Sequence, residues 1–166
     1  MKTILISCLL LFALLPAAAQ PKMVDSTNYH YNAPQMGDYI TFRILFEFSL
    51  RLKPDALQVL DLYIVPVLKQ NPEIKFQIEY HTDCRATAEY NRDYSQRVAD
   101  TLRAYIISQG IDSSQIIAKG MGEDDLLLKK CDCDLRDYSY KCTEYEHQLN
   151  RRAILRIIGL VEEKNE

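Results

Sequence analysis

The sequence has no tryptophan, little glycine and no surplus of positive charge. Glycine accounts for only 5 of the 166 residues, so glycine-rich loops that cradle nucleotide phosphates are not expected. The formal net charge is −3, and without a basic surplus to neutralise phosphates, nucleic acid is not predicted as a partner. Hydrophobic residues make up 48% and charged residues 26%, which is typical of a folded globular chain and excludes wholesale disorder.

Recognisable enzyme motifs are missing too. The sequence contains no nucleophile elbow, phosphate-binding loop or zinc-protease helix. The segment Gly120-Met121-Gly122 is followed by three acidic residues, Glu123-Asp124-Asp125, which would repel a phosphate group. Glu47, Asp83 and Glu123 are conceivable acid–base groups, but no pattern in the sequence pairs them. We therefore predict a non-catalytic protein without a cofactor or a metal.

The N-terminal residues 1–19 have the three parts of a secretory signal peptide. Lys2 supplies the positive start, residues 4–15 form a short apolar stretch, and Ala17-Ala18-Ala19 offers a cleavage site. This stretch is too short for a membrane span, and no later segment is long and apolar enough, so no transmembrane segment is predicted. We expect a periplasmic protein, with association with the outer membrane as a further option.

Four cysteines remain after such a cleavage: Cys84, Cys131, Cys133 and Cys142. An even number in an exported chain favours disulfides over free thiols. Cys131 and Cys133 are too close in sequence to bond each other comfortably. Two pairings stay open, Cys133–Cys142 with Cys84–Cys131 or Cys131–Cys142 with Cys84–Cys133. Zinc held by the later cysteines and His147 is a less favoured alternative, because oxidising compartments favour disulfides.

Hydrophobic periodicity predicts four strands and two main helices. The strands are expected over residues 39–48, 75–80, 115–119 and 152–160. The helices are expected from Pro54 onward, with a kink or an early end near Tyr63 caused by Pro66, and over residues 88–109. A long loop is expected over residues 121–147. This order predicts an α/β fold, a two-layer domain with right-handed crossovers between its parallel strands.

Two finer expectations concern the second helix and the third strand. An apolar stripe is expected along the helix, formed by Tyr90, Tyr94, Val98, Leu102 and Tyr105, with Gly110 as the C-cap. The third strand is expected to end at the glycines that follow Lys119. Outside the domain, predicted over residues 40–160, we expect an extended arm at residues 20–39 and a tail at residues 161–166.

An ordered series of short motifs carries a family resemblance. The series is His81-Thr82-Asp83, Tyr90-Asn91 with Ser95 and Ala99, Gly110-Ile111-Asp112, Ala118-Lys119-Gly120-Met121-Gly122-Glu123, and Asn150-Arg151-Arg152. In order and spacing it resembles the OmpA-like C-terminal domain, the module that binds peptidoglycan in Gram-negative bacteria. Residues 144–152 and the cysteine-bearing loop look like the variant common in Bacteroidetes-type members.

The resemblance implies a fold, a ligand and a set of site residues. The fold is an α/β two-layer sandwich with a four-stranded mixed sheet and two main helices on one face. The ligand is the diaminopimelate unit of the peptidoglycan stem, a zwitterion that needs one fixed anion and one fixed cation. The implied anion is Asp83, and the other implied ligand-binding residues are Thr82, Asn91, Arg97 and Arg151. Peptidoglycan is therefore the predicted partner, with envelope proteins as a further option. The competing prediction is a structural or adaptor protein of the envelope that has lost the peptidoglycan site.

This chain departs from the family motif Asn-x-x-Leu-Ser-x-x-Arg-Ala at the arginine that supplies the cation. The clamping arginine falls on Val98, and Arg97 comes one residue early, which turns it by about 100° around the helix. Arg85, Arg97 and Arg151 are candidates for replacing the missing cation. The sequence alone therefore predicts weak binding that Val98→Arg would strengthen.

Overall fold

The computed structural model describes residues 36–42, 50–131, 133 and 142–161. The predicted signal peptide, most of the predicted arm and nearly all of the predicted tail lie outside the described residues. So do residues 43–48 of the first predicted strand, which is confirmed over β1 (Tyr39–Phe42).

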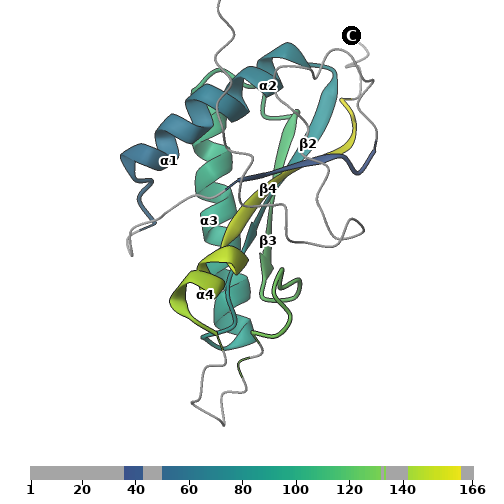
Figure 1. Ribbon diagram of the computed structural model, residues 1–166. Helices are drawn as coiled ribbons and strands as arrows, with labels where there is room; N and C mark the ends of the chain where they lie inside the picture. Colours follow the sequence, from purple (N-terminus) through teal and green to yellow (C-terminus); the bar gives the residue numbers. More distant parts are fainter. Residues whose placement is uncertain (1–35, 43–49, 132, 134–141, 162–166) are drawn as a thin grey trace, which may run out of the picture.

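A four-stranded mixed sheet forms one layer of the fold (Figure 1). It consists of β1, β2 (Ile74–His81), β3 (Ile116–Gly122) and β4 (Arg152–Leu160), in the spatial order β1-β4-β2-β3. Strands β2 and β3 are parallel, whereas β4 is antiparallel to both of its neighbours, β1 and β2. The predicted fold class is confirmed.

The first helical segment runs through its proline instead of ending before it. It consists of α1 (Pro54–Val59), a π-helical turn η1 (Leu60–Ile64) and α2 (Val65–Gln70). The N–H of Val65 donates to the carbonyl of Leu60, five residues earlier, which is the π-helical spacing. Pro66 has no N–H, and its ring would clash with the preceding turn of a regular helix. The wider turn accommodates the ring, so the predicted early end near Tyr63 is wrong and only a local irregularity is found.

The second helix, α3 (Ala88–Ser108), matches the predicted span, but its buried face differs from the predicted stripe. Val98 and Leu102 are buried, whereas Tyr90 is 54% exposed. The residues that α3 buries are Asn91, Ser95, Val98, Ala99, Leu102 and Ile106. Tyrosine combines an apolar ring with a polar hydroxyl, so it lies at the border of a core as readily as inside it. Gly110 follows the C-cap residue Gln109 with a φ of +89°, a conformation that glycine adopts without strain.

Strand β3 continues through the glycines that were expected to end it. Gly120 pairs with Tyr80 of β2, and the strand ends only at Gly122. A Cβ atom at Gly120 would lie 2.3 Å from the backbone nitrogen of Gln96 on α3. Glycine here permits the close approach of helix and strand, so it is a packing requirement and not a strand terminator.

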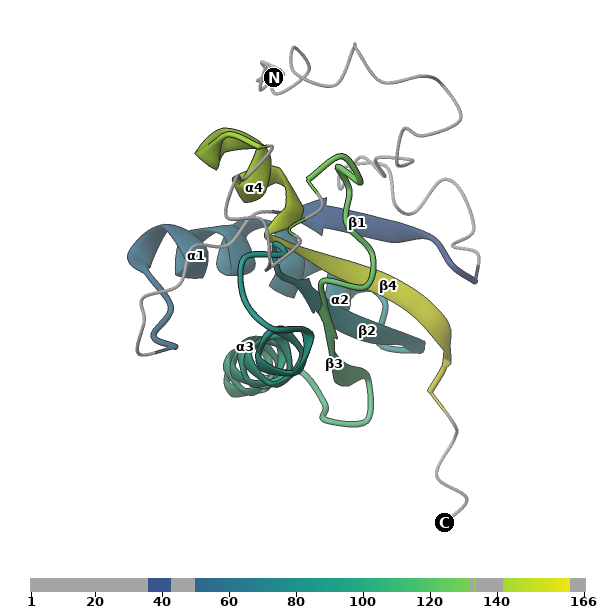
Figure 2. The same cartoon turned by 90° about the horizontal axis from the view of Figure 1, so that it is seen from below.

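The end of the predicted long loop forms a short helix, α4 (Glu144–Asn150) (Figure 2). Its start is fixed by a capping box, in which the Thr143 side chain accepts from the N–H of Glu146 and the Glu146 carboxylate accepts from the N–H of Thr143. This helix was not predicted, although the spacing Thr143-x-x-Glu146 is its sequence signature.

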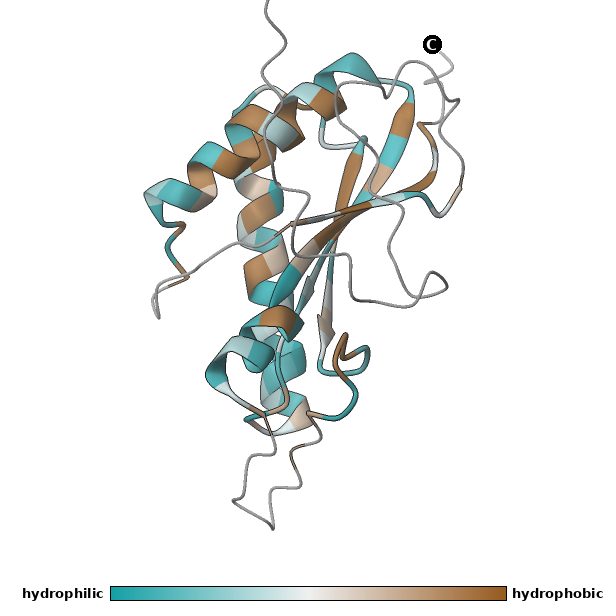
Figure 3. Ribbon diagram, viewed as in Figure 1, coloured by the Kyte–Doolittle hydropathy of each residue, from teal (hydrophilic) through white to brown (hydrophobic). Residues whose placement is uncertain are grey.

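One face of the sheet and the two long helical segments enclose the hydrophobic core. Phe76, Ile78 and Tyr80 point from β2 into the same cluster as Leu60 of η1 and Leu102 of α3. Figure 3 shows hydrophobic residues on α1, α2 and the upper part of α3, whereas α4 and the lower end of α3 are mainly hydrophilic. The apolar core and the polar end of the molecule are therefore separate regions.

Candidate functional site

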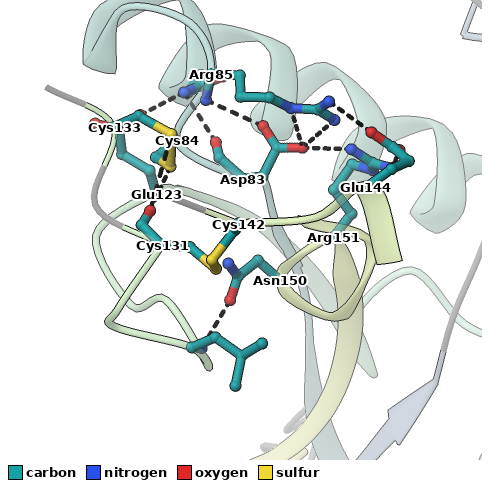
Figure 4. Close-up of a disulfide and its surroundings, with 12 residues drawn as sticks. Asp83, Cys84, Arg85, Glu123, Cys131, Cys133, Cys142, Glu144, Asn150 and Arg151 are labelled. Carbon is teal, nitrogen blue, oxygen red and sulfur yellow. Dashed lines mark hydrogen bonds and ion pairs between the residues drawn. A yellow bond between two sulfur atoms is a disulfide. The ribbon is translucent and has the colours of Figure 1, made fainter. Parts of the chain in front are cut away.

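Four charged side chains meet at the carboxyl end of β2, and we call them the Asp83 cluster: Asp83, Arg85, Glu144 and Arg151 (Figure 4). The guanidinium of Arg85 donates to Asp83 Oδ2 from Nη2 at 2.7 Å and from Nε at 3.2 Å. Arg151 donates to the same oxygen. Glu144 accepts from Arg85 at 2.6 Å and from Arg151 at 2.5 Å. Each carboxylate is thus shared by both guanidinium groups.

Three segments of the chain supply these side chains. Asp83 and Arg85 lie in the loop between β2 and α3, Glu144 is the first residue of α4, and Arg151 lies between α4 and β4. The antiparallel register of β2 and β4 places His81 opposite Arg152. Residues just beyond β2 and just before β4 therefore reach the same edge of the sheet, which explains why Asp83 meets Arg151.

The charges of the cluster hold both carboxylates ionised. Burial by itself would raise the pKa of Asp83, but hydrogen bonds from the side chain and the backbone N–H of Arg85, together with Arg151, lower it below its ordinary value. Hydrogen bonds from Arg151 and Arg85 lower the pKa of Glu144 to about 2. The cluster therefore carries two negative and two positive charges near neutral pH.

The members of the cluster differ in exposure. The Asp83 side chain is 10% exposed, whereas those of Arg85 and Arg151 are 32% and 28% exposed. Glu144 is the most exposed, at 56%. Both guanidinium groups and one carboxylate are thus within reach of a ligand, while Asp83 forms the floor of the cluster.

The predicted site residues Asn91 and Thr82 support the loop that carries Asp83. Asn91 Nδ2 donates to the backbone carbonyl of Asp83 at 3.1 Å and also to the carboxylate of Glu123. The backbone N–H of Thr82 donates to the carbonyl of Gly122 at 2.8 Å. Both residues are buried, so the structure gives them a positioning role for the Asp83 loop.

Arg97 does not join the cluster, although it was predicted as a site residue. Its side chain is 50% exposed and forms an ion pair with Asp93 at 3.0 Å, one turn earlier on α3. Val98, which stands at the family's clamp position, is 0% exposed within the hydrophobic core. Of the three arginines considered for the missing cation, Arg85 and Arg151 contact Asp83.

Two disulfides lie in this region, and one of them joins Cys133 to the corner that carries Asp83. They link Cys84 to Cys133 and Cys131 to Cys142, which is the second of the two pairings left open by the sequence. Sulfur atoms of Cys84 and Cys133 and a ring nitrogen of His147 lie within 4.8 Å of one another. Because the two sulfurs are bonded to each other, they do not offer thiolates to a metal ion in this state.

Glu144 and Glu123 were not predicted as site residues. Glu144 bridges both arginines, and Glu123 accepts from Asn91 at the end of β3. The capping box at Thr143 was the available signal for Glu144, because it marks a helix start and places an acidic residue in the first turn. Glu123 stands in the motif series at the end of β3, but its contact with Asn91 depends on the approach of β3 to α3.

Comparison with known proteins places this chain in a family. The sequence model described as "OmpA family" matches residues 46–134, which is more than half of the chain. The chain belongs to the OmpA family. This confirms the resemblance predicted from the motifs, whereas the Bacteroidetes-type variant stays a prediction.

Relatives within and around this family cover the chain to different extents. A peptidoglycan-associated lipoprotein of Pasteurella multocida is 26% identical over 147 residues, which is 86% of this chain and 89% of the relative. Another from Haemophilus influenzae is 30% identical over 101 residues, 61% of this chain and 58% of the relative. The outer membrane protein A of Klebsiella aerogenes is 31% identical over 84 residues, 49% of this chain, and the match spans only 24% of that protein. None of these relatives is named for an enzymatic activity, in agreement with the predicted non-catalytic domain.

Solved structures share the fold. The peptidoglycan-associated lipoprotein of Burkholderia pseudomallei aligns with a TM-score of 0.55 at 23% identity, covering 70% of this chain and 88% of that chain. The cell wall anchor of a type VI secretion system from Pseudomonas aeruginosa aligns with a TM-score of 0.54 at 19% identity, covering 73% and 80%. Within the part of the chain that the structure describes, no helix combines the length and the apolar composition needed to cross a bilayer.

Proposed function

We propose that this OmpA-family chain is an exported, periplasmic protein that binds the diaminopimelate unit of the peptidoglycan stem at the Asp83 cluster. The observation that carries the proposal is the direct contact of Asp83 with two partly exposed arginines, Arg85 and Arg151. The names of its relatives, peptidoglycan-associated lipoproteins among them, favour the same ligand.

The charges of the cluster suit a zwitterion. An ammonium group would donate to Asp83 and Glu144, and a carboxylate would accept from Arg85 and Arg151, which present planar sets of N–H donors. Arg85 and Arg151 thereby supply the cation that the family motif places at the position of Val98. A neutral cluster that receives a neutral zwitterion also leaves the net charge of the site unchanged.

Binding is expected to be weak, because the cluster is already paired internally. Asp83 Oδ2 accepts from both arginines, and Oδ1 accepts from the backbone N–H of Arg85 at 3.1 Å. A ligand must replace some of these hydrogen bonds with its own. Only the difference in free energy between the new and the replaced hydrogen bonds contributes to affinity. Glu144, the most exposed member, is the side chain most easily displaced.

The same internal pairing favours the second candidate function, a structural or adaptor protein of the envelope. In that function Asp83, Arg85, Glu144 and Arg151 would only fix the loop beside α4. The two functions differ in one measurable respect, which is whether removal of the Asp83 charge weakens a ligand.

The test is calorimetric titration with two stem peptides. One contains diaminopimelate and the other contains lysine, which lacks the second carboxylate. We expect the diaminopimelate peptide to bind more tightly, and Asp83→Asn and Arg151→Gln each to lower its affinity by about 10- to 150-fold, the range of one charge-assisted hydrogen bond. Arg97→Gln is the matched control and should leave the affinity unchanged. If Asp83→Asn binds as tightly as the wild type, the adaptor function is favoured.

A further inference from the structure

An exposed pair of tyrosines lies at the start of α3, beside the Asp83 cluster. The rings of Tyr90 and Tyr94 are stacked with their centroids 6.0 Å apart and their planes 7° from parallel. Tyr90 is 54% exposed and Tyr94 is half-buried. The outer ring of this stack is thus open to solvent.

The start of α3 contacts the loop that carries Asp83, because Asn91, which lies between Tyr90 and Tyr94 in sequence, donates from Nδ2 to the backbone carbonyl of Asp83 at 3.1 Å. Burial and Tyr90 raise the pKa of Tyr94, and the positive charges of Arg151 and Arg97 act against them. Burial raises the pKa of Tyr80, and Tyr94 and Asp83 both add to that rise. Tyr94 is thus one turn of α3 beyond Asn91, the residue that contacts the Asp83 loop.

The position of Tyr94 in the sequence is also distinctive. The family motif Asn-x-x-Leu-Ser has leucine where this chain has Tyr94. A leucine there would fill the same half-buried space without an aromatic face. The stack with Tyr90 therefore depends on an aromatic residue at this position of the motif.

From this geometry we infer that Tyr90 and Tyr94 form a subsite for a sugar ring of the peptidoglycan glycan strand. The inference rests on the proposed function, because a stem peptide held at Asp83 would bring its attached sugar to the neighbouring surface. A pyranose ring presents a face of C–H bonds that packs on the electron-rich face of an aromatic ring. Its hydroxyl groups can exchange hydrogen bonds with the hydroxyl of Tyr94.

The chemistry of the surroundings favours a sugar over a purely apolar partner. The stack lies on the same turn of α3 that contacts the Asp83 loop, and an apolar segment extending from the stack over the charged cluster would desolvate it without providing hydrogen bonds. A sugar satisfies both kinds of surface, since its ring is apolar on one face and its edge is polar. The subsite therefore extends the zwitterion site from the stem peptide to the glycan.

The test compares two ligands that share one stem peptide, the free diaminopimelate peptide and the same peptide attached to its disaccharide. Tyr90→Ala should lower the affinity for the disaccharide peptide about three- to tenfold, the range of one aromatic contact, and leave the free peptide within about twofold. Tyr94→Leu should act in the same direction while preserving the packing. Tyr63→Ala, at a tyrosine of η1 that is 44% exposed, is the matched control.

The outcomes separate this inference from the proposed function. Equal losses for both ligands, or no loss for either, in Tyr90→Ala would overturn the sugar subsite even if Asp83→Asn still weakens the free peptide. A selective loss for the disaccharide peptide supports the subsite even if Asp83→Asn has no effect, and the proposed zwitterion site then fails alone. Thermal melting of each variant confirms that the fold is retained, and a variant that melts early is replaced by Tyr90→Leu in the same comparison.

Discussion

The hydrophobic core and the Asp83 cluster are stabilised in different ways. Val98, Leu60 and Leu102 are 0% exposed and contact other apolar side chains, so the core depends on burial, which salt and reductant affect little. The cluster has partly exposed ion pairs and lies beside two disulfides, so it depends on charge and on covalent links. Val98, at the family's clamp position, lies in the hydrophobic core of this chain. The arginines Arg85 and Arg151 lie in the Asp83 cluster.

This difference separates the family's clamp position from the arginines that contact Asp83. Arg85 and Arg151 reach Asp83 from loops at the end of the sheet, where water remains accessible. An arginine on the buried face of α3 would need a partner within the core. The comparison predicts that changes in the core alter stability, whereas changes in the cluster alter binding more than stability.

The largest effect is expected from Val98→Arg. An arginine at this position would place a positive charge among apolar residues with no carboxylate opposite, so the free energy of unfolding should fall by about 3–5 kcal/mol. The expectation from the sequence alone, that the variant strengthens binding, stays a prediction. Urea denaturation measures the change in the free energy of unfolding. The control is Arg97→Ala, one residue away at a side chain that is 50% exposed. Its free energy of unfolding should stay within about 0.5 kcal/mol of the wild-type value. Wild-type stability of Val98→Arg would show that its guanidinium has reached the cluster.

The next largest effect is expected from removing the disulfide between Cys84 and Cys133. Replacing both residues with serine should lower the free energy of unfolding by about 2–4 kcal/mol, because the unfolded chain regains the freedom of a closed loop. The affinity for the stem peptide should fall as well, since Cys84 directly follows Asp83. Replacing Cys131 and Cys142 is the matched control, in a loop with a sequence separation of 11 instead of 49. Unchanged affinity in both double variants would contradict a link between the disulfides and the site.

The smallest effect is expected from Glu144→Gln, and it should depend on pH. The pKa of Glu144 is lowered from 4.5 to about 2 in the fold, so its contribution to stability is complete above pH 4.5 and is lost as the pH falls toward 2. The difference in unfolding free energy between wild type and variant should therefore be constant near neutral pH and should vanish in acid. Denaturation curves at several pH values measure this difference. A difference that persists at pH 2 would indicate a packing role for Glu144 instead of a charge role.

Several features of the fold could be predicted because they depend on neighbours in the sequence. Alternating residues such as Phe76 and Ile78 indicate a strand, and the helical spacing of Val98 and Leu102 indicates α3. These patterns repeat every two or every three to four residues, so a short window contains them. The ordered motifs that include Asp83 predicted the family, which the comparison confirmed.

Other features were missed because they depend on segments that meet only in space. The sequence pattern predicted that the third strand ends at Gly120. The structure instead requires glycine there because the backbone of Gln96 on α3 packs closely against it. The sequence placed Tyr90 in the core, yet the rotation of α3 against the sheet leaves it exposed. Helix α4 was missed as well, although its capping box at Thr143 is a signal within a short stretch of sequence.

By itself, the sequence determined the strands, the long helices and the family, and it singled out Asp83 as a candidate site residue. Only the tertiary structure decided which cations meet that anion and which cysteines pair. Arg151 lies 68 residues from Asp83 in sequence and reaches it because β2 and β4 run antiparallel with His81 opposite Arg152. Arg97, much closer in sequence, pairs instead with Asp93 on its own helix. Helical and strand periodicity fix the direction of a side chain relative to its own element, but an ion pair between elements depends on how those elements are placed together.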